Sequence, residues 1–260
     1  MGTAQLQGSL WGARVQDYAE IVEQFIRPLY EAVFDAAEVG TGISFLDVGC
    51  GPGLAAELAD QRGAHVAGID AAETSLEIAR ERTPDGDFRI GEMENLPWPD
   101  NTFDVVTGFN AFQYAADVIN ALREARRVAK PGGRVAMAVW GRAEDCDTVA
   151  VVAALSKFLP PPPPGAPGPF ALSAPGRVEG FLQQAGLTPL TSNEVDCPFE
   201  FPNLETAVRG HMSSGPAAAA IRQAGAEAVQ QAIAESLAPF RQNGSGYRQR
   251  NRFRYVIAAA

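Results

Sequence analysis

The sequence lacks the features by which proteins engage nucleic acids or membranes. Its 260 residues carry a formal net charge of −10, and Lys and Arg form no long run. Clustered basic side chains are needed to neutralise a phosphate backbone, so we expect no nucleic-acid partner. No stretch approaches the roughly eighteen uninterrupted apolar residues of a membrane span, and the first residues do not resemble a signal peptide. We therefore expect no membrane association and a cytoplasmic location.

Cysteine and histidine are also scarce. The cysteines, Cys50, Cys146 and Cys197, are far apart and form no CxxC pair, which argues against a disulfide framework or a thiolate zinc site. The only histidines are His65 and His211, and no set of residues has a recognisable metal-ligand spacing, so we expect no metal. Reduced thiols agree with a cytoplasmic location.

Short apolar runs alternate with helical stretches along much of the chain. Strands are predicted at 43–48, 65–70, 87–90, 103–108, 134–140, 187–195 and 253–257. Helices are predicted between them at 54–62, 75–82, 118–129 and 177–185. Because repeated strand-helix steps form a parallel sheet covered by helices, we expect an α/β fold with a seven-stranded, mostly parallel sheet and helices on both of its faces.

Other stretches fall outside this alternation. Further helices are predicted at 15–39, where Pro28 divides the helix, at 148–158 and at 204–237. Five consecutive prolines at 160–164 favour polyproline II, which indicates a stiff loop more than a docking motif. The stretches 142–175 and 198–246 are candidates for a cap beside the functional site. We expect one domain, with a helical lid (1–39), a cofactor-binding core (40–141) and a segment holding the cap and remaining strands (142–260).

A glycine-rich turn follows the first predicted strand. Gly49, Gly51 and Gly53 allow the backbone to approach a ligand closely, at the point where a helix N-terminus offers free amides. Asp70 follows the second strand about twenty residues later, where a carboxylate can accept both hydroxyls of an adenosine ribose. A dinucleotide fingerprint beginning at Gly49 requires glycine where Leu54 stands, and the turn follows Asp47 instead of an apolar residue. The pattern therefore predicts a nucleoside site and argues against NAD.

Four motifs in order resemble those of class I S-adenosylmethionine-dependent methyltransferases, in the broad group of the ubiquinone and menaquinone methyltransferases. They are Leu46–Gly53, Gly68–Asp70, Gly91–Asp104 and Arg127–Gly133. The resemblance covers roughly residues 40 to 141 and extends to the rest of the chain only in layout. It implies a Rossmann-like fold whose last strand is antiparallel, and S-adenosylmethionine as the cofactor.

The resemblance also implies the cofactor contacts. Asp47 and the loop Gly49–Gly53, which includes Cys50 and Gly51, would hold the methionine end, and Asp70 would bind the ribose. The adenine would pack beside Ala71 and meet Glu92 and Met93. The family more often has aspartate at the position of Glu92. Further contacts are assigned to Phe109, Gln113 and Tyr18.

Some aromatic and charged side chains have two interpretations at this stage. Trp11 and Tyr18 either contact the cofactor or pack as part of an amphipathic lid helix, from which Arg14 would reach the cofactor carboxylate. Phe112 and Tyr114 are either site residues or core aromatics. The arginines Arg248, Arg250 and Arg252 either face an anionic acceptor or lie along a solvated strand edge.

The combined prediction is a methyltransferase that acts on a small-molecule acceptor by direct in-line transfer. Proximity and orientation supply much of the rate enhancement in such a reaction, so a dedicated base is optional. No catalytic residue is assigned, and His211 is the only histidine worth testing as a base. The alternatives are a non-catalytic S-adenosylmethionine-binding protein and an NAD(P)-dependent oxidoreductase. The acceptor, the methylated atom and the oligomeric state are left open.

Overall fold

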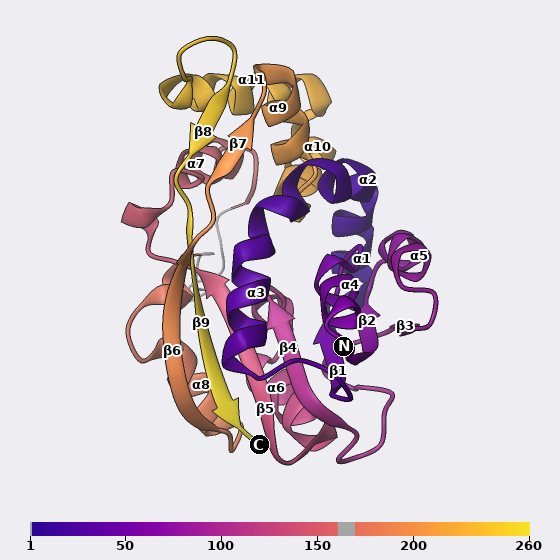
Figure 1. The fold of residues 1–260 in the computed structure, drawn as a ribbon. Coiled ribbons are helices and arrows are strands. Elements are labelled where there is room, and N and C mark those ends of the chain that lie inside the picture. The colour runs from indigo at the N-terminus through magenta and orange to yellow at the C-terminus, as the bar shows by residue number, and fades with distance from the viewer. Residues whose placement is uncertain (1, 161–169) are drawn as a thin grey trace.

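The computed structural model describes residues 2–160 and 170–260 and is built around a seven-stranded sheet with the order β3-β2-β1-β4-β5-β9-β6 (Figure 1). Its strands are β1 (Ser44–Val48), β2 (His65–Asp70), β3 (Asp87–Ile90), β4 (Phe103–Phe109), β5 (Ala129–Trp140), β6 (Thr188–Asp196) and β9 (Arg252–Ala259). Neighbouring strands pair in parallel, except that β9 is antiparallel to both β5 and β6. The predicted fold class is confirmed, including the antiparallel last strand.

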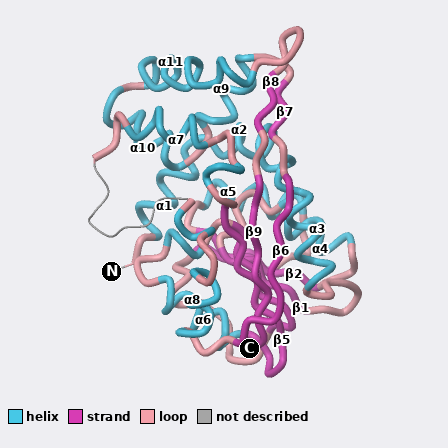
Figure 2. Tube along the Cα trace, turned by 90° about the vertical axis from the view of Figure 1, so that its left-hand side faces the viewer, coloured by secondary structure: helices cyan, strands magenta, loops and turns pink. Residues whose placement is uncertain are grey.

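Helices cover both faces of this sheet. The α-helices of the described residues are α1 (Ala4–Trp11), α2 (Val15–Asp17), α3 (Arg27–Ala36), α4 (Leu54–Gln61), α5 (Glu73–Arg82), α6 (Val118–Val128), α7 (Val149–Ser156), α8 (Arg177–Gln184), α9 (Leu204–Met212), α10 (Gly215–Ala224) and α11 (Ala226–Leu237). In Figure 2 the sheet is seen from its side, with α6 and α8 against one face and α3 and α4 against the other.

The strand sequences supply both halves of the core. Successive side chains of a strand point to opposite faces, and β5 shows this clearly. Val135, Met137 and Val139 belong to the cluster under α6 and α8, whereas Ala136 and Ala138 belong to the cluster under α3 and α4. All five side chains are buried, which explains why this strand reads as a continuous apolar run.

The two stretches expected to form a cap do lie together. Helix α11 packs against α7, α9 and α10, and two short strands, β7 (Phe199–Phe201) and β8 (Tyr247–Gln249), form a separate antiparallel pair beside them. Figure 1 shows this group at one end of the molecule, beyond the carboxyl ends of the parallel strands. The second sheet is absent from the sequence prediction because three-residue strands give too short a pattern.

Two predicted helices are divided in the structure. The stretch 204–237 forms three helices, because Ser214 caps α10 ahead of Pro216 and Gly225 adopts a left-handed φ of 83° between α10 and α11. The stretch 15–39 contains α2, a π-helical turn at Tyr18–Val22 and a 3₁₀ turn before α3 begins at Arg27, next to Pro28.

Other element ends agree with prediction to within two residues, except that β5 begins five residues earlier than expected, at Ala129. Helix α1 lies within the predicted helical lid but ahead of the stretch 15–39. The proline run at 161–164 lies outside the described residues.

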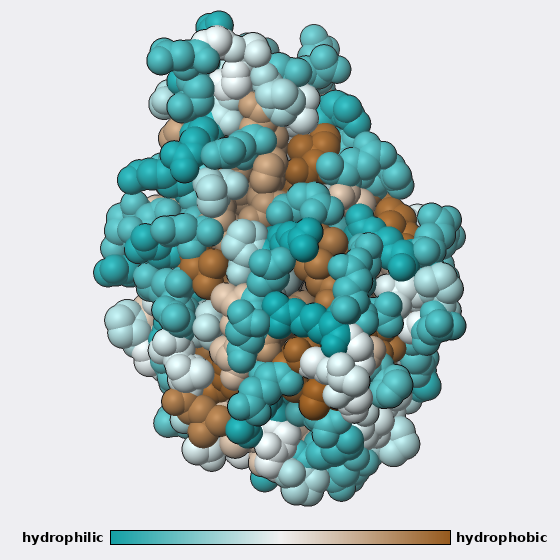
Figure 3. Space-filling model, viewed as in Figure 1, coloured by the Kyte–Doolittle hydropathy of each residue, from teal (hydrophilic) through white to brown (hydrophobic). Residues whose placement is uncertain are grey.

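The outer surface carries few large apolar side chains. In Figure 3 hydrophobic surface on the viewed face is confined to small patches between hydrophilic residues. Such scattered patches are usual for a protein surface. Across residues 2–160 and 170–260, no helix has the length and apolar character required to cross a bilayer.

Candidate functional site

A cavity opens at the carboxyl ends of β1, β2 and β4, on both sides of the point where the strand order reverses. Ligands of open α/β sheets bind at this position. The cavity offers about 130 Å³ to the centres of water-sized molecules, and about 860 Å³ of empty space when the region open to solvent at its mouth is included. Its lining residues are Thr3, Ala4, Gln7, Trp11, Val15, Tyr18, Gly49, Gly51, Pro52, Ile69, Asp70, Ala71, Ser75, Gly91, Glu92, Met93, Phe109, Asn110, Ala111 and Tyr114.

The glycine loop between β1 and α4 forms the floor of this cavity. Gly49, Gly51 and Gly53 have φ values of 74°, 54° and 86°, a left-handed conformation that glycine adopts without strain. A Cβ atom on Gly49 would lie 2.6 Å from the Cβ of Ala111. A Cβ on Gly51 would meet no atom within 4 Å, so the backbone there faces open space. The loop therefore exposes its main chain to a ligand at Gly51.

Asp70 ends β2 and binds the same loop. Its Oδ2 accepts a hydrogen bond from the Gly51 N–H at 2.9 Å, and its Oδ1 accepts one from the Ala72 N–H at 2.8 Å. Burial raises the pKa of this carboxyl, and the two backbone donors oppose that rise. Each carboxylate oxygen can accept more than one hydrogen bond, so Asp70 retains the capacity to bind the hydroxyls of a ribose.

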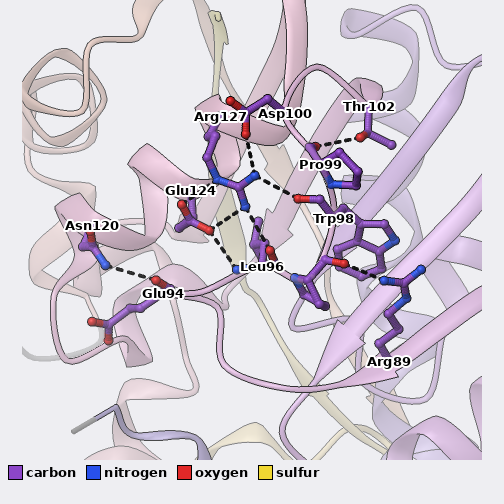
Figure 4. A network of polar contacts seen from close by, with 11 residues as sticks. Arg89, Glu94, Leu96, Trp98, Pro99, Asp100, Thr102, Asn120, Glu124 and Arg127 are labelled. Atoms are coloured by element: carbon purple, nitrogen blue, oxygen red, sulfur yellow. Dashed lines mark hydrogen bonds and ion pairs between the residues drawn. The ribbon is translucent and has the colours of Figure 1, made fainter.

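The segment after β3 is held in place by Arg127 of α6 (Figure 4). The Arg127 guanidinium donates to the carbonyls of Leu96 and Trp98 at 2.9 and 2.8 Å, and it pairs with Glu124 and Asp100. These contacts join two of the sequence motifs, and they raise the pKa of Arg127 further above its usual value. The network thereby fixes the loop whose first residues reach the cavity.

Glu92 and Met93 lie at the start of that loop and line the cavity. The Glu92 Oε2 accepts a hydrogen bond from the Ala4 N–H at 3.0 Å, at the first turn of α1. A carboxylate is favoured there by the free amides and dipole of the helix. Glu92 therefore binds the lid with one oxygen, and its other oxygen has no protein partner among the described residues.

Helix α1 covers the cavity and lies within the predicted helical lid, ahead of the stretch 15–39 for which a helical pattern was found. Thr3, Ala4, Gln7 and Trp11 face the cavity, and the Trp11 ring meets Tyr114 edge to face at 5.6 Å. The helix lies so close to the end of β2 that a Cβ on Gly8 would be 2.0 Å from the Ala71 carbonyl oxygen. Glycine at this position permits the close approach.

Two of the three lid residues considered from the sequence reach the cavity. Trp11 and Tyr18 line the cavity, whereas the Arg14 guanidinium pairs with Asp17 at 3.2 Å and lies outside it. Burial raises the pKa of Tyr18, so its hydroxyl is protonated at neutral pH.

Of the twelve predicted cofactor contacts, eight line the cavity. They are Tyr18, Gly49, Gly51, Asp70, Ala71, Glu92, Met93 and Phe109. Tyr114, which had two interpretations, also lines it, whereas Phe112 is a fully buried core residue.

The other four predicted contacts lie behind the cavity wall. Asp47 is buried and accepts a hydrogen bond from the Thr107 hydroxyl at 2.8 Å, and burial raises its pKa to about 8. Cys50 is buried, and Gly53 is the residue before α4. The Gln113 Nε2 donates to the Asn110 Oδ1 at 3.5 Å, and Gln113 itself does not line the cavity.

His211 and the tail arginines lie away from this cavity. The His211 Nε2 is 2.7 Å from the Gln249 Oε1 inside the cap, and burial lowers the pKa of the imidazole to about 4. Arg248, Arg250 and Arg252 form ion pairs with surface carboxylates, namely Glu200, Asp147 and Asp196. None of the three arginines lines the cavity, and the strand edge is wrong for Arg252, because β9 pairs with β5 on one side and β6 on the other.

Comparison with known proteins identifies the same region of the chain. Residues 46–137 match the family model described as a methyltransferase domain. A demethylmenaquinone methyltransferase of Paenarthrobacter aurescens is 37% identical over 41% of this chain and 42% of the relative. The 27-O-demethylrifamycin SV methyltransferase of Amycolatopsis mediterranei is 28% identical over 74% of this chain and 73% of its own length.

The fold comparison covers more of the chain than the sequence matches do. The YcgJ protein of Bacillus subtilis superimposes with a TM-score of 0.60 at 22% identity, over 88% of this chain and 97% of the other. The chain spans about half the length of the curated relatives it matches, from 42% to 51% for the first three. The matched domain, the sheet order and the glycine loop agree, and they identify residues 46–137 as a methyltransferase domain of the class I, S-adenosylmethionine-dependent type.

Proposed function

We propose that the chain transfers a methyl group from S-adenosylmethionine to a small-molecule acceptor. The observation that carries this proposal is the cavity in which the open backbone at Gly51, the carboxylate of Asp70 and Glu92 meet beneath α1. When bound, S-adenosylmethionine supplies an already activated methyl group for direct in-line transfer.

The chemistry of the cavity fits this cofactor. Asp70 accepts the ribose hydroxyls with the lone pairs left by its two backbone donors. The oxygen of Glu92 that does not bind Ala4 accepts from the adenine amino group, and Met93 packs beside the ring. Asp47 lies beneath the loop and acts by shaping it through Thr107.

The protein residues position the reactants and exclude water. Helix α1 covers the mouth of the cavity, and Trp11, Tyr18 and Tyr114 form an aromatic wall under it. Excluding water and orienting the acceptor are the main requirements when the methyl group is already activated. The proposal assigns no general base, because His211 is bonded to Gln249 and does not line the cavity.

The acceptor we propose is a partly apolar small molecule. Trp11, Met93 and Phe109 give the cavity an apolar lining beside the glycine loop. The names of the relatives, a demethylmenaquinone and a demethylrifamycin methyltransferase, support acceptors of this kind.

The same proposal covers the organisation and setting of the chain. We assign residues 1–39 to the lid, 40–141 to the cofactor core, and 142–260 to the cap and remaining strands. The net charge of −10 supports an acceptor other than nucleic acid. The three cysteines are free and buried, which supports a reducing compartment such as the cytoplasm.

Calorimetry and a transfer assay test the proposal. We expect S-adenosylhomocysteine to bind with a micromolar-range Kd. Methyl transfer from isotope-labelled S-adenosylmethionine to a panel of quinols, phenols and macrocyclic alcohols is then followed by mass spectrometry. Absence of binding would reject the proposal, and binding without transfer to any acceptor would favour a non-catalytic binding protein.

A further inference from the structure

A buried ion pair joins the lid to the glycine loop. Glu23 follows the π-helical turn and is 1% exposed. Its Oε1 accepts a hydrogen bond from the Leu54 N–H at 3.1 Å, and its Oε2 accepts one from the Arg82 Nη1 at 2.5 Å. The same Arg82 nitrogen donates to the Pro52 carbonyl at 2.9 Å. The pair therefore holds the chain on both sides of Gly53.

The π-helical turn brings Glu23 to this position. The Glu23 N–H donates to the carbonyl of Tyr18, five residues earlier, so the two residues stack on one side of the helix. In an α-helix, residues five apart point about 140° away from each other. Tyr18 lines the cavity while Glu23 binds the loop behind it. One turn of the lid thus reaches the cavity through Tyr18 and the chain after Gly53 through Glu23.

Burying this ion pair costs desolvation free energy, so side-chain packing alone does not account for its presence. A carboxylate loses its hydration when it is buried, and a buried ion pair rarely adds stability compared with apolar side chains of the same size. Burial raises the pKa of Glu23, while Arg82 and the Leu54 amide oppose that rise. The carboxylate also lies at the N-terminus of α4, where the helix dipole favours it. The Leu54 amide and Arg82 hold the carboxylate in one position, as expected for a side chain that fixes the geometry of the loop.

We propose that Glu23 is a positioning residue for the cofactor loop. Together with Arg82 it ties the lid to the loop and maintains the backbone of Gly51–Gly53 in the shape that binds S-adenosylmethionine. Cofactor affinity then depends on a side chain that does not line the cavity. This inference rests on the proposed cofactor binding, and it extends that function to a residue outside the four sequence motifs.

Substitutions at Glu23 and at a matched carboxylate test the role. Calorimetry with S-adenosylhomocysteine is performed at a temperature well below the Tm of each variant. We expect Glu23→Ala to raise the Kd on the order of tenfold, as for the loss of one hydrogen bond to a charged group. Glu23→Gln retains an acceptor for the Leu54 N–H and should have a smaller effect. The control is Glu57→Gln, since Glu57 lies 4.0 Å from Arg82 but is more exposed, and its effect should stay below about threefold.

A double-variant cycle separates positioning from general stability. Glu23→Gln and Arg82→Gln both remove the contact that the two side chains share, while each side chain also has its own bond to the loop, so the double variant should lose less affinity than the sum of the two single losses. Unchanged Kd values with only a lower Tm, or additive losses in the double variant, would overturn the proposal. If Glu23→Ala does not fold, the Glu23→Gln and Glu57→Gln comparison decides the question. Failure of the wild-type chain to bind S-adenosylhomocysteine would instead reject the proposed function.

Discussion

Replacing Asp70 by alanine tests the centre of the proposed site. The substitution removes a carboxylate that accepts hydrogen bonds from the Gly51 and Ala72 amides, at 2.9 and 2.8 Å. It therefore frees the glycine loop from the end of β2 and removes the acceptor proposed for the two ribose hydroxyls. Both effects weaken cofactor binding.

The expected loss follows from the hydrogen bonds involved. A hydrogen bond to a charged group contributes about 1.5–3 kcal/mol, so two ribose contacts correspond to about 3–6 kcal/mol. Since about 1.4 kcal/mol changes a Kd tenfold, Asp70→Ala should weaken S-adenosylhomocysteine binding by about 10² to 10⁴ fold. The free protein should lose only about 1–2 kcal/mol of stability, because the two freed amides lie beside a cavity that water can enter.

Calorimetry and thermal unfolding of Asp70→Ala and Asp104→Ala provide the measurement. Asp104 is a matched control at the amino ends of β1 and β4, away from the cavity. Its Oδ2 accepts hydrogen bonds from the Ser44 N–H at 2.9 Å and from Lys130 at 2.8 Å. We expect the two variants to lose similar stability and only Asp70→Ala to lose affinity. A Kd for Asp70→Ala within about threefold of wild type, or an equal loss in both variants, would refute the assignment.

Three further predictions concern stability. Gly49→Ala should lower the free energy of unfolding by about 1–3 kcal/mol and weaken cofactor binding, because its Cβ would lie 2.6 Å from Ala111. Gly132 has a similar φ, but a Cβ there would meet open space, so Gly132→Ala should lose only the free energy of the strained backbone. A urea titration measures both losses. The pKa of His211 is lowered to about 4, so between pH 6.5 and 4 the unfolded state binds a proton that the folded state does not. The free energy of unfolding should fall by about 3 kcal/mol over this range, and His211→Gln should lack that slope; identical slopes would contradict this. Phe34→Ala removes a fully buried ring and should cost about 3–5 kcal/mol in the same titration, and a loss below about 1 kcal/mol would contradict its place in the core.

Local patterns in the sequence determined the centre of the site. The left-handed glycines of the loop and the acid at the end of the second strand are set by chemistry within a few residues. Gly51 and Asp70 were predicted from the glycine turn and the acid after the second strand, and Glu92 and Phe109 from the resemblance to the methyltransferases; all four line one cavity. The alternation of apolar runs and helical stretches was sufficient to predict the seven-stranded sheet.

Packing between distant segments changed several of the predicted contacts. Asp47 lies in the first motif and Gln113 follows the fourth strand, yet neither lines the cavity; the Asp47 carboxylate accepts a hydrogen bond from Thr107 of the neighbouring strand. The alanine-rich stretch after Leu204 keeps a helical pattern, but it is divided at Ser214 and Gly225. Backbone direction at such points depends on the helices packed around them.

Only the tertiary structure revealed how the site is closed. Helix α1 reaches the cavity through the approach of Gly8 to Ala71, and the pair of Glu23 with Arg82 links residues 59 positions apart. Neither contact has a local period or motif, since each depends on the relative placement of segments that only the folded chain brings together. The sequence determined the sheet and the loop that binds a nucleoside, and long-range packing decided what covers that loop and holds it in shape.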